Sequence, residues 1–316
     1  MLEPIFFQPN YKKVVWGGNN INSFFHRNLD EPDNIGESWE ISAHKDGISK
    51  IINNCYNNQN LYELFNDKTK RKEIFGNKCL NMDKFPVLAK FIDADKSLSI
   101  QVHPDDEYAK IHENDNGKNE VWYIMDCKDD AKIIYGFKDE IKEKNLDNLL
   151  KNIENNVKYI NVKRGDFISI PAGTIHAICG GITLCEVQQS SDVTYRVYDW
   201  NRLGLDGKPR QLHKNKALDV IKMDSCESIY NYYKFNENKN IYNSKNFNID
   251  LINVKESLAL ESDENSFIVY IMLDGNGSIK TEKFGKNIEK GSCFLIPAEL
   301  GEYTLYGNLR LLKVYI

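Results

Sequence analysis

Hydrophobic and polar residues alternate with a period of two in seven short segments of the chain. These segments are rich in β-branched and aromatic residues and are separated by Gly, Asp, Asn and Pro, which is typical of short strands joined by turns. They are residues 98–102, 121–125, 167–170, 182–187, 193–198, 267–273 and 293–296. The pattern therefore predicts a mainly β protein built as a sandwich or barrel.

Helical spacing of apolar residues is confined to three segments. Residues 61–65 and 146–153 each carry one apolar stripe at i, i+3, i+4 spacing, and a third helix is expected in residues 214–222. The polar loop 105–118 separates two of the predicted strands. Loops of that length in compact domains are often functional.

An Asn- and Lys-rich stretch at residues 231–245 is the best linker candidate, because its few apolar residues bury too little surface to offset the conformational entropy lost on ordering. We therefore expect two domains, 1–230 and 231–316. An internal repeat supports this division: RGDFISIPAGTIH at 164–176 and KGSCFLIPAELGE at 290–302 share a basic residue, a glycine turn, a strand and Pro-Ala. Only the first copy continues to a histidine, so we expect that one copy kept a site that the other lost.

Composition and charge exclude several classes of partner. Among 316 residues, Lys+Arg 41 against Asp+Glu 46 gives a formal net charge of -5, so a nucleic-acid partner is not expected. No apolar run approaches the ~20 residues that span a bilayer, and the N-terminus lacks the pattern of a signal peptide. The seven cysteines have no CxxC spacing, which favours reduced, mostly buried thiols. We expect a cytoplasmic protein without a membrane partner.

Four polar residues have the spacing of a metal site. Gln101 and His103 stand two apart before a proline, so both point to the same face of a predicted strand. His176 follows a strand and a Pro-x-Gly turn, and Glu120 opens another strand. Such mixed nitrogen and oxygen ligands suit Zn²⁺, while two histidines and a carboxylate equally suit non-haem iron. The alternative is that these groups only form hydrogen bonds in a core.

Charged residues near this group in the sequence indicate an anionic ligand. Lys118 precedes Glu120 by two residues, and Arg196 lies inside an alternating strand, where it is costly unless it meets an anion. A phosphate or carboxylate ligand would satisfy Arg196, and a salt bridge to Asp192 or Asp199 would do so equally well. Glu186 is a second possible interior carboxylate.

Several segments together resemble the type I mannose-6-phosphate isomerases of the cupin superfamily, particularly their short bacterial form. They are WGG at 16–18, GESWEIS at 36–42, residues 86–106 around SIQVHP, GKNEVWYIM at 117–125, residues 162–178 around PAGTIH, and EVQQSSDVTYRVYDWNR at 186–202. The resemblance covers most of the chain. It implies two cupin-type jelly-roll β-sandwich units with a few short helices, the C-terminal one without metal.

The resemblance also assigns roles to residues of this sequence. It implies that the metal ligands are Gln101, His103, Glu120 and His176, the glutamine being a weaker ligand in some members. Arg196 matches the active-site arginine, and Lys118 the pocket lysine. Ser99 matches a serine associated with the sugar phosphate. The large inserted helical domain of longer members has no room here, so we expect loop 105–118 and helix 146–153 to close the pocket.

The expected function is an aldose–ketose isomerisation of mannose 6-phosphate and fructose 6-phosphate through an enediolate, with one zinc ion per chain. Arg196, Lys118 and Glu186 are the expected catalytic residues, and Ser99 joins the first two in binding the phosphosugar. The proton carrier stays open among Glu186, Lys118 and a zinc-bound water. An iron-dependent cupin oxygenase and a non-catalytic sugar-binding cupin are the alternatives, and we expect a monomer or a homodimer.

Overall fold

The structure is a computed structural model, and it describes residues 2–53, 56, 59–138, 146–223 and 229–316. Residue contacts divide the chain into two compact units, each assembled from segments distant in sequence. Unit 1 consists of residues 1–10, 39–88 and 235–316, and unit 2 of residues 11–38 and 89–234. No helix in these described stretches has the length and apolar character needed to cross a membrane.

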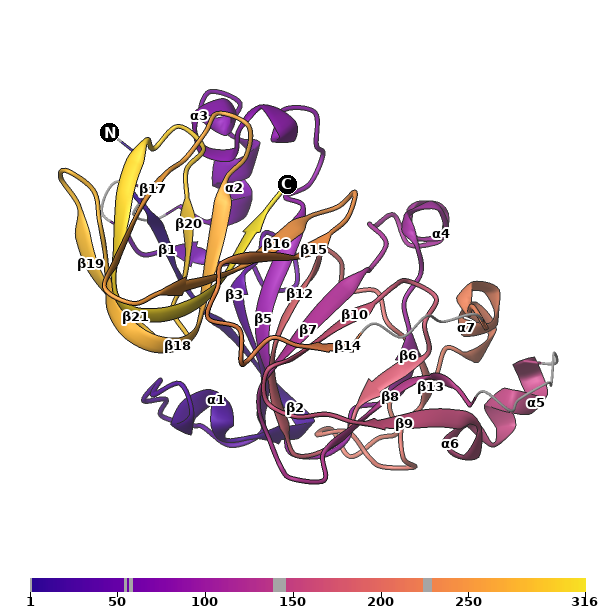
Figure 1. The fold of residues 1–316 in the computed structure, drawn as a ribbon. Coiled ribbons are helices and arrows are strands. Elements are labelled where there is room, and N and C mark those ends of the chain that lie inside the picture. The colour runs from indigo at the N-terminus through magenta and orange to yellow at the C-terminus, as the bar shows by residue number, and fades with distance from the viewer. Residues whose placement is uncertain (1, 54–55, 57–58, 139–145, 224–228) are drawn as a thin grey trace. The chain divides into compact units, whose positions relative to one another are not determined.

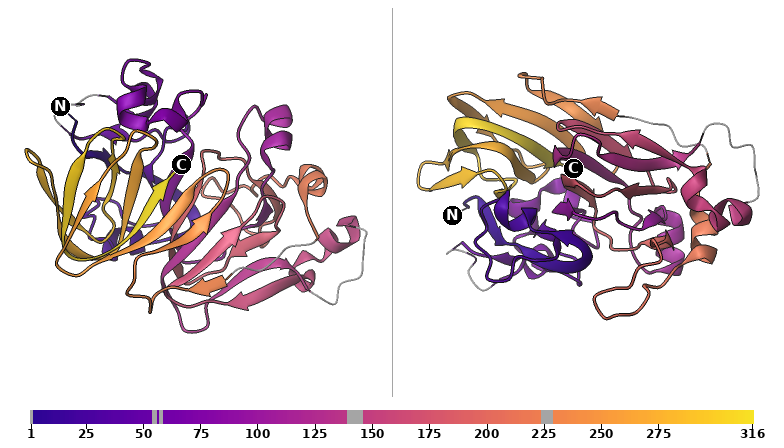
Figure 2. Two further views of the ribbon diagram at one scale, coloured as in Figure 1. Left: turned by 45° about the horizontal axis from the view of Figure 1, so that its top comes forward. Right: turned by 90° about the horizontal axis from the view of Figure 1, so that it is seen from below.

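Unit 1 is a sheet of nine strands that curls around an apolar core. Its order is β15-β16-β21-β18-β20-β1-β4, with β17 paired to β21 and β19 paired to β18. The strands are β1 (Ile5–Gln8), β4 (Lys50–Ile51), β15 (Lys239–Asn243), β16 (Asn248–Val254), β17 (Ser257–Glu261), β18 (Ile268–Lys280), β19 (Gly285–Glu289), β20 (Cys293–Ile296) and β21 (Glu302–Tyr315). The long antiparallel pair β18 and β21 is prominent in Figure 2, and its register shifts between Met272 and Asp274. Such an irregularity bends a strand and lets a sheet curl.

The interior of unit 1 is filled by aromatic and aliphatic side chains. Tyr270, Phe294 and Tyr303 are buried there, and the hydroxyls of Tyr270 and Tyr303 lie 2.9 Å apart. Strand β1 joins the sheet through pairing of Phe6 with Phe294. The unit also holds short helices: α2 (Leu61–Asn66), α3 (Arg71–Phe75) and the 3₁₀ turn η2 (Asn77–Cys79). Helix α2 begins with a capping box, in which the Asn60 side chain accepts from the backbone N–H of Glu63 at 2.8 Å.

Unit 2 is a sandwich of two antiparallel sheets. One has seven strands in the order β14-β10-β7-β12-β5-β2-β3, and the other has five in the order β13-β6-β11-β8-β9. The strands are β2 (Asn10–Gly18), β3 (Ile35–Ile41), β5 (Val87–Ala94), β6 (Ile100–Val102), β7 (Glu120–Cys127), β8 (Lys132–Phe137), β9 (Val157–Asn161), β10 (Asp166–Ile170), β11 (His176–Ile178), β12 (Ile182–Gln189), β13 (Tyr195–Tyr198) and β14 (Ile229–Asn231). Side chains of both sheets, among them Trp122, Ile168, Tyr135 and Ile178, form the core.

The helices of unit 2 are α1 (Asn20–Ser23), α4 (Asp106–His112), α5 (Leu146–Lys151), α6 (Ile153–Asn156) and α7 (Lys214–Val220). Helices α5, α6 and α7 gather near strands β6, β8, β9 and β13 (Figure 1). Leu149, Leu150 and Ile153 pack there with Ile100 and Val102 in a second apolar cluster. The expectation that helix 146–153 closes the pocket is therefore wrong, because these side chains cover the five-stranded sheet instead.

The predicted mainly β fold is confirmed, and each of the seven predicted strands overlaps an observed one. The predicted helix 146–153 is split after Lys151, and the side chain of Leu146 lies outside the described residues. The loop 105–118 contains a short helix, α4, whose first turn is capped by Asp105. Five cysteines are free, as expected, while Cys55 and Cys226 lie outside the described residues.

The expected domains and the compact units differ in extent. The boundary between residues 234 and 235 falls inside the Asn- and Lys-rich stretch, but residues 1–10 and 39–88 belong with the C-terminal segment. Strand pairing between β1 and β20 is the physical reason, because it joins the N-terminus to the last strands. The assignment of catalysis to 1–230, with a metal-free unit at 231–316, stays a prediction.

Candidate active site

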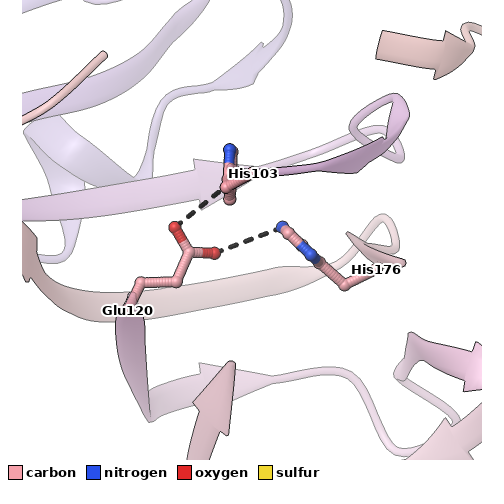
Figure 3. A group of neighbouring side chains, drawn as sticks. All are labelled: His103, Glu120 and His176. Atoms are coloured by element: carbon pink, nitrogen blue, oxygen red, sulfur yellow. Dashed lines mark ion pairs between the residues drawn. The ribbon is translucent and has the colours of Figure 1, made fainter. Parts of the chain in front are cut away.

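Three side chains converge inside unit 2. Glu120 is the first residue of β7, His176 is the first of β11, and His103 directly follows β6. One ligand atom from each lies within 4.8 Å of the others, and all three residues are buried. Figure 3 shows one carboxylate oxygen of Glu120 facing each histidine, at 3.5 Å from His103 Nε2 and 3.2 Å from His176 Nε2. The strand starts thus bring together groups far apart in sequence.

Both histidines are oriented by backbone carbonyls. Nδ1 of His103 lies 2.8 Å from the carbonyl oxygen of Val193, and Nδ1 of His176 lies 2.8 Å from that of Thr174. An Nδ1–H that donates to a carbonyl leaves Nε2 as the acceptor directed inward. Burial and the nearby Lys118 ammonium lower the pKa of His103 well below its usual value, which favours the neutral ring. Two imidazole acceptors and a carboxylate fit a transition-metal ion.

Gln101 lies beside this group through strand pairing. It stands opposite His176 in the β6–β11 register, and its Nε2 is 3.5 Å from His176 Nε2. Its Oε1 accepts a hydrogen bond from Ser99 Oγ at 3.2 Å. Ligation of a metal by Gln101 would require the amide to rotate so that its oxygen faces the histidines.

Lys118 is buried against the same group, on the loop just before β7. Its Nζ lies 2.8 Å from Glu120 Oε2 and 3.1 Å from His103 Nε2. Burial disfavours the charged form of Glu120, but Lys118, His103 and His176 together outweigh it and hold the pKa of Glu120 well below its usual value. Glu120 is thus an ionised carboxylate, as a metal ligand must be.

A second buried ion pair joins β5 and β12, and of its residues only Glu186 was predicted from the sequence. Lys90 Nζ is 3.0 Å from Glu186 Oε1 and 3.4 Å from Glu37 Oε2, while Trp122 Nε1 donates to Glu186 Oε2 at 2.8 Å. Burial and then Glu120 raise the pKa of Glu186. Burial opposes the charge of Lys90, yet the surrounding carboxylates, Glu186 first among them, together outweigh it and raise the pKa of Lys90. A lysine alternating with Leu88 and Ile92 was the available signal.

A pocket of about 310 Å³ opens beside these groups in unit 2. Gln101 and Lys118 line it, so the pocket adjoins the His103–Glu120–His176 group. The other residues that line it are Val14, Trp16, Glu37, Lys90, Ile92, Leu98, Ser99, Ile178, Glu186, Asp192, Thr194, Arg196 and Arg210. None comes from helices α4 to α7. The predicted residues Ser99, Gln101, Lys118, Glu186 and Arg196 therefore share one cavity.

Arg196 reaches the pocket from β13, where it stands opposite Gln101. Its Nη1 donates to the backbone carbonyl of Gln211 at 2.9 Å, while its buried Nε has no hydrogen-bond partner among the described residues. Asp199 pairs instead with Arg202 and Arg210, and within the described chain no carboxylate forms an ion pair with Arg196. The alternative of a salt bridge to Asp192 or Asp199 is therefore wrong.

Comparison with known proteins places this chain in a family. Residues 5–133 match the model of the phosphomannose isomerase type I catalytic domain, and residues 237–316 match that of the mannose-6-phosphate isomerase cupin domain. The chain is 36% identical over 312 residues to mannose-6-phosphate isomerase ManA of Bacillus subtilis, covering 96% of each chain. It is 34% identical to the mannose-6-phosphate isomerase of Streptococcus mutans, covering 99% of this chain and 98% of that one.

Solved structures agree with these matches. The crystal structure of mannose 6-phosphate isomerase from Bacillus subtilis superposes with a TM-score of 0.88 at 32% identity, covering 100% of both chains. A mannose 6-phosphate isomerase bound with zinc and yttrium has a TM-score of 0.78 at 15% identity, covering 99% of both chains, and shows the shared fold alone. The fold and site define a cupin-type enzyme. The chain belongs to the type I phosphomannose isomerases.

Proposed function

We propose that this enzyme interconverts mannose 6-phosphate and fructose 6-phosphate, using one zinc ion per chain. The observation that carries the proposal is the buried group of His103, Glu120 and His176 beside a pocket whose lining includes cationic side chains. The names of the full-length relatives support the reaction. This group lies within unit 2, so the proposal also assigns catalysis to the N-terminal domain.

The ion would be held by Nε2 of His103, Nε2 of His176 and the carboxylate of Glu120, with Gln101 as a further ligand after rotation of its amide. Inward Nε2 acceptors and an ionised carboxylate support this assignment. When bound, zinc supplies a Lewis acid for the sugar oxygens, which is worth several kcal/mol of charge stabilisation.

The chain's own residues bind the sugar and handle the proton that moves between C1 and C2. Ser99 and Lys118 orient the substrate next to the metal group, and Arg196 stabilises negative charge on the enediolate or on the phosphate. Glu186 is the preferred carrier of the proton, because it lines the same pocket and burial raises its pKa. Lys118 is the second candidate.

The cellular setting is part of the proposal. The five described free cysteines suit a reducing compartment, so we place the enzyme in the cytoplasm. The expectation of a monomer or a homodimer stays a prediction.

The test combines metal analysis with an assay. Protein purified without added metal should contain about one zinc per chain and should form fructose 6-phosphate from mannose 6-phosphate in a coupled assay. Iron with substrate-dependent oxygen consumption would favour the oxygenase alternative. Zinc without turnover but with sugar binding would favour a non-catalytic cupin.

A further inference from the structure

Three arginines and one aspartate form a cluster at the pocket. Asp199 Oδ1 lies 2.8 Å from Arg202 Nη2 and 2.6 Å from Arg210 Nη2. Arg196 completes the cluster without an ion pair of its own among the described residues. One carboxylate therefore faces three guanidinium groups, which leaves two positive charges without a partner of opposite sign in the cluster.

Arg202 and Arg210 share Asp199 but face different surroundings. Arg202 directs Nη1 to the backbone carbonyl of Ser97 at 2.6 Å and does not line the pocket. Arg210 binds Asp199 through Nε at 2.7 Å and through Nη2, and it lines the pocket. Its Nη1 has no hydrogen-bond partner in the described part of the chain. Arg202 thus has a structural role, whereas Arg210 keeps a hydrogen-bond donor that a ligand in the pocket can accept from.

The backbone holds Arg210 near Arg196. A tight loop returns the chain, with Leu203 bridged to Pro209 and the N–H of Gly204 donating to the carbonyl of Lys208 at 2.8 Å. After Arg210, the carbonyl of Gln211 accepts from Arg196 Nη1. The N–H of His213 donates to the carbonyl of Arg196 at 2.7 Å. The two guanidinium groups are therefore positioned before a ligand arrives, which lowers the entropy that binding must lose.

Charge is distributed unevenly within the pocket. The carboxylates of Glu37, Glu186 and Asp192 attract the ammonium of Lys90, and Glu186 forms an ion pair with it. Burial, followed by repulsion from Arg210, lowers the pKa of Arg196, so an added anion would relieve that repulsion. A dianionic group is therefore favoured beside the arginines and disfavoured beside the carboxylates.

We propose that Arg210, fixed by Asp199, determines the specificity of the pocket for a phosphorylated sugar by binding the phosphate together with Arg196. This inference rests on the proposed function and names the subsite that holds the substrate's phosphate. A phosphate monoester carries about −1.5 to −2 charges at pH 7, which matches the two unpaired positive charges. Two planar guanidinium groups offer the forked donors that phosphate oxygens accept best.

The experiment compares Arg210→Gln with Arg202→Gln, which removes the other partner of Asp199. Binding of inorganic phosphate is measured by calorimetry on the full-length protein, and KM and kcat are measured with mannose 6-phosphate. We expect Arg210→Gln to weaken phosphate binding and raise KM about 10- to 100-fold, the range for a lost hydrogen bond to a charged group, with kcat changed less than about threefold. Arg202→Gln should lower the melting temperature and leave phosphate affinity within about threefold.

Arg210→Lys gives a second variant in case the glutamine substitution impairs folding. It keeps the charge but loses the fork, so phosphate affinity should fall about tenfold. Unchanged phosphate affinity in either folded Arg210 variant, or an equal loss in Arg202→Gln, would overturn the inference. The proposed function fails separately. A wild-type protein that does not isomerise mannose 6-phosphate, yet loses phosphate binding with Arg210→Gln, would refute the function and keep the anion subsite.

Discussion

The two copies of the internal repeat share a glycine turn, but the next strand begins with a different kind of residue in each copy. Gly165 and Gly291, which precede β10 and β20, have φ angles of 88° and 85°, a left-handed conformation that favours glycine. The next strand of unit 2 then opens with His176, which is buried, whereas that of unit 1 opens with Glu302, which is exposed. The same local geometry thus serves two different interiors.

The interiors of the two units differ in how their buried polar side chains are paired. In unit 2, Lys118 and Glu120 are charged and buried, and each depends on the other and on the nearby histidines. In unit 1, the side-chain hydroxyls of the buried pair Tyr270 and Tyr303 bond to each other, and burial raises the pKa of Tyr303 to about 12. Buried ion pairs add little net stability, while an apolar core adds much. This difference supports the proposal that unit 2 carries the chemistry, while unit 1 contributes an apolar core.

The largest effect is expected from ending the chain after Lys234. Strands β15 to β21 would be lost, and β1 and β4 would lose the sheet to which they pair through β20. Ile5, Phe6 and Phe7 would then meet water, so the fragment should be insoluble or melt far below the full chain. Soluble yield and thermal melting measure this. A stable, fully active fragment would contradict the packing role of unit 1.

His176→Ala should abolish the chemistry of unit 2 while the fold persists. Removing one imidazole should release the metal and, with several kcal/mol of transition-state stabilisation, lower kcat/KM by about 1,000-fold or more. Metal content and the coupled assay measure both effects. His112→Ala, at an exposed position on α4, is the matched control and should keep zinc and turnover. Zinc bound at two equivalent sites per chain would show that unit 1 also kept a metal site.

Arg196→Lys should lower activity without releasing metal. A compact ammonium cannot reproduce the planar fork that faces the pocket, so kcat/KM should fall about 10- to 100-fold. Zinc content should equal that of the wild type, which separates this effect from that of His176→Ala. Unchanged kinetics would mean that Arg196 only supports the backbone at Gln211.

Tyr270→Phe should have the smallest effect and should concern stability alone. It leaves the hydroxyl of Tyr303 buried without a partner, which costs about 1–3 kcal/mol of unfolding free energy. Denaturant unfolding measures the loss. Tyr306→Phe at an exposed position in β21, the strand of Tyr303, should change stability little. A drop in zinc content with Tyr270→Phe would contradict the division of roles between the units.

Much of the site could be predicted from the sequence because its spacing is local. Gln101 and His103 are two apart on a strand, and His176 follows a glycine turn. Lys90 was missed because it resembles one polar position in a buried strand, and only the pairing of β5 with β12 brings Glu186 to it. Arg210 lies after a loop, and its position at the pocket depends on its contact with Asp199. Hydrophobic periodicity does not predict that contact.

The fold, too, could be predicted from the sequence only where it depends on local spacing. Strand positions follow from alternation, but the composition of unit 1 depends on pairing between Phe6 and Phe294, near opposite ends of the chain. The apolar side of helix 146–153 was predicted correctly, but an amphipathic pattern does not predict which surface a helix covers. Leu149 and Leu150 pack onto the five-stranded sheet rather than the pocket.

The pairing of β1 with β20 also has a consequence during synthesis. The N-terminal strand leaves the ribosome first but can pair with β20 only after residues 293–296 have followed it. Unit 2 is complete at residue 234, so its histidines and Glu120 can assemble while the rest is still being translated. Residues 1–10 and 39–88 can form the pair of β1 with β4, but their apolar side chains lack the rest of the unit 1 sheet until residues 235–316 follow. The candidate site can therefore form before the protein gains its full stability.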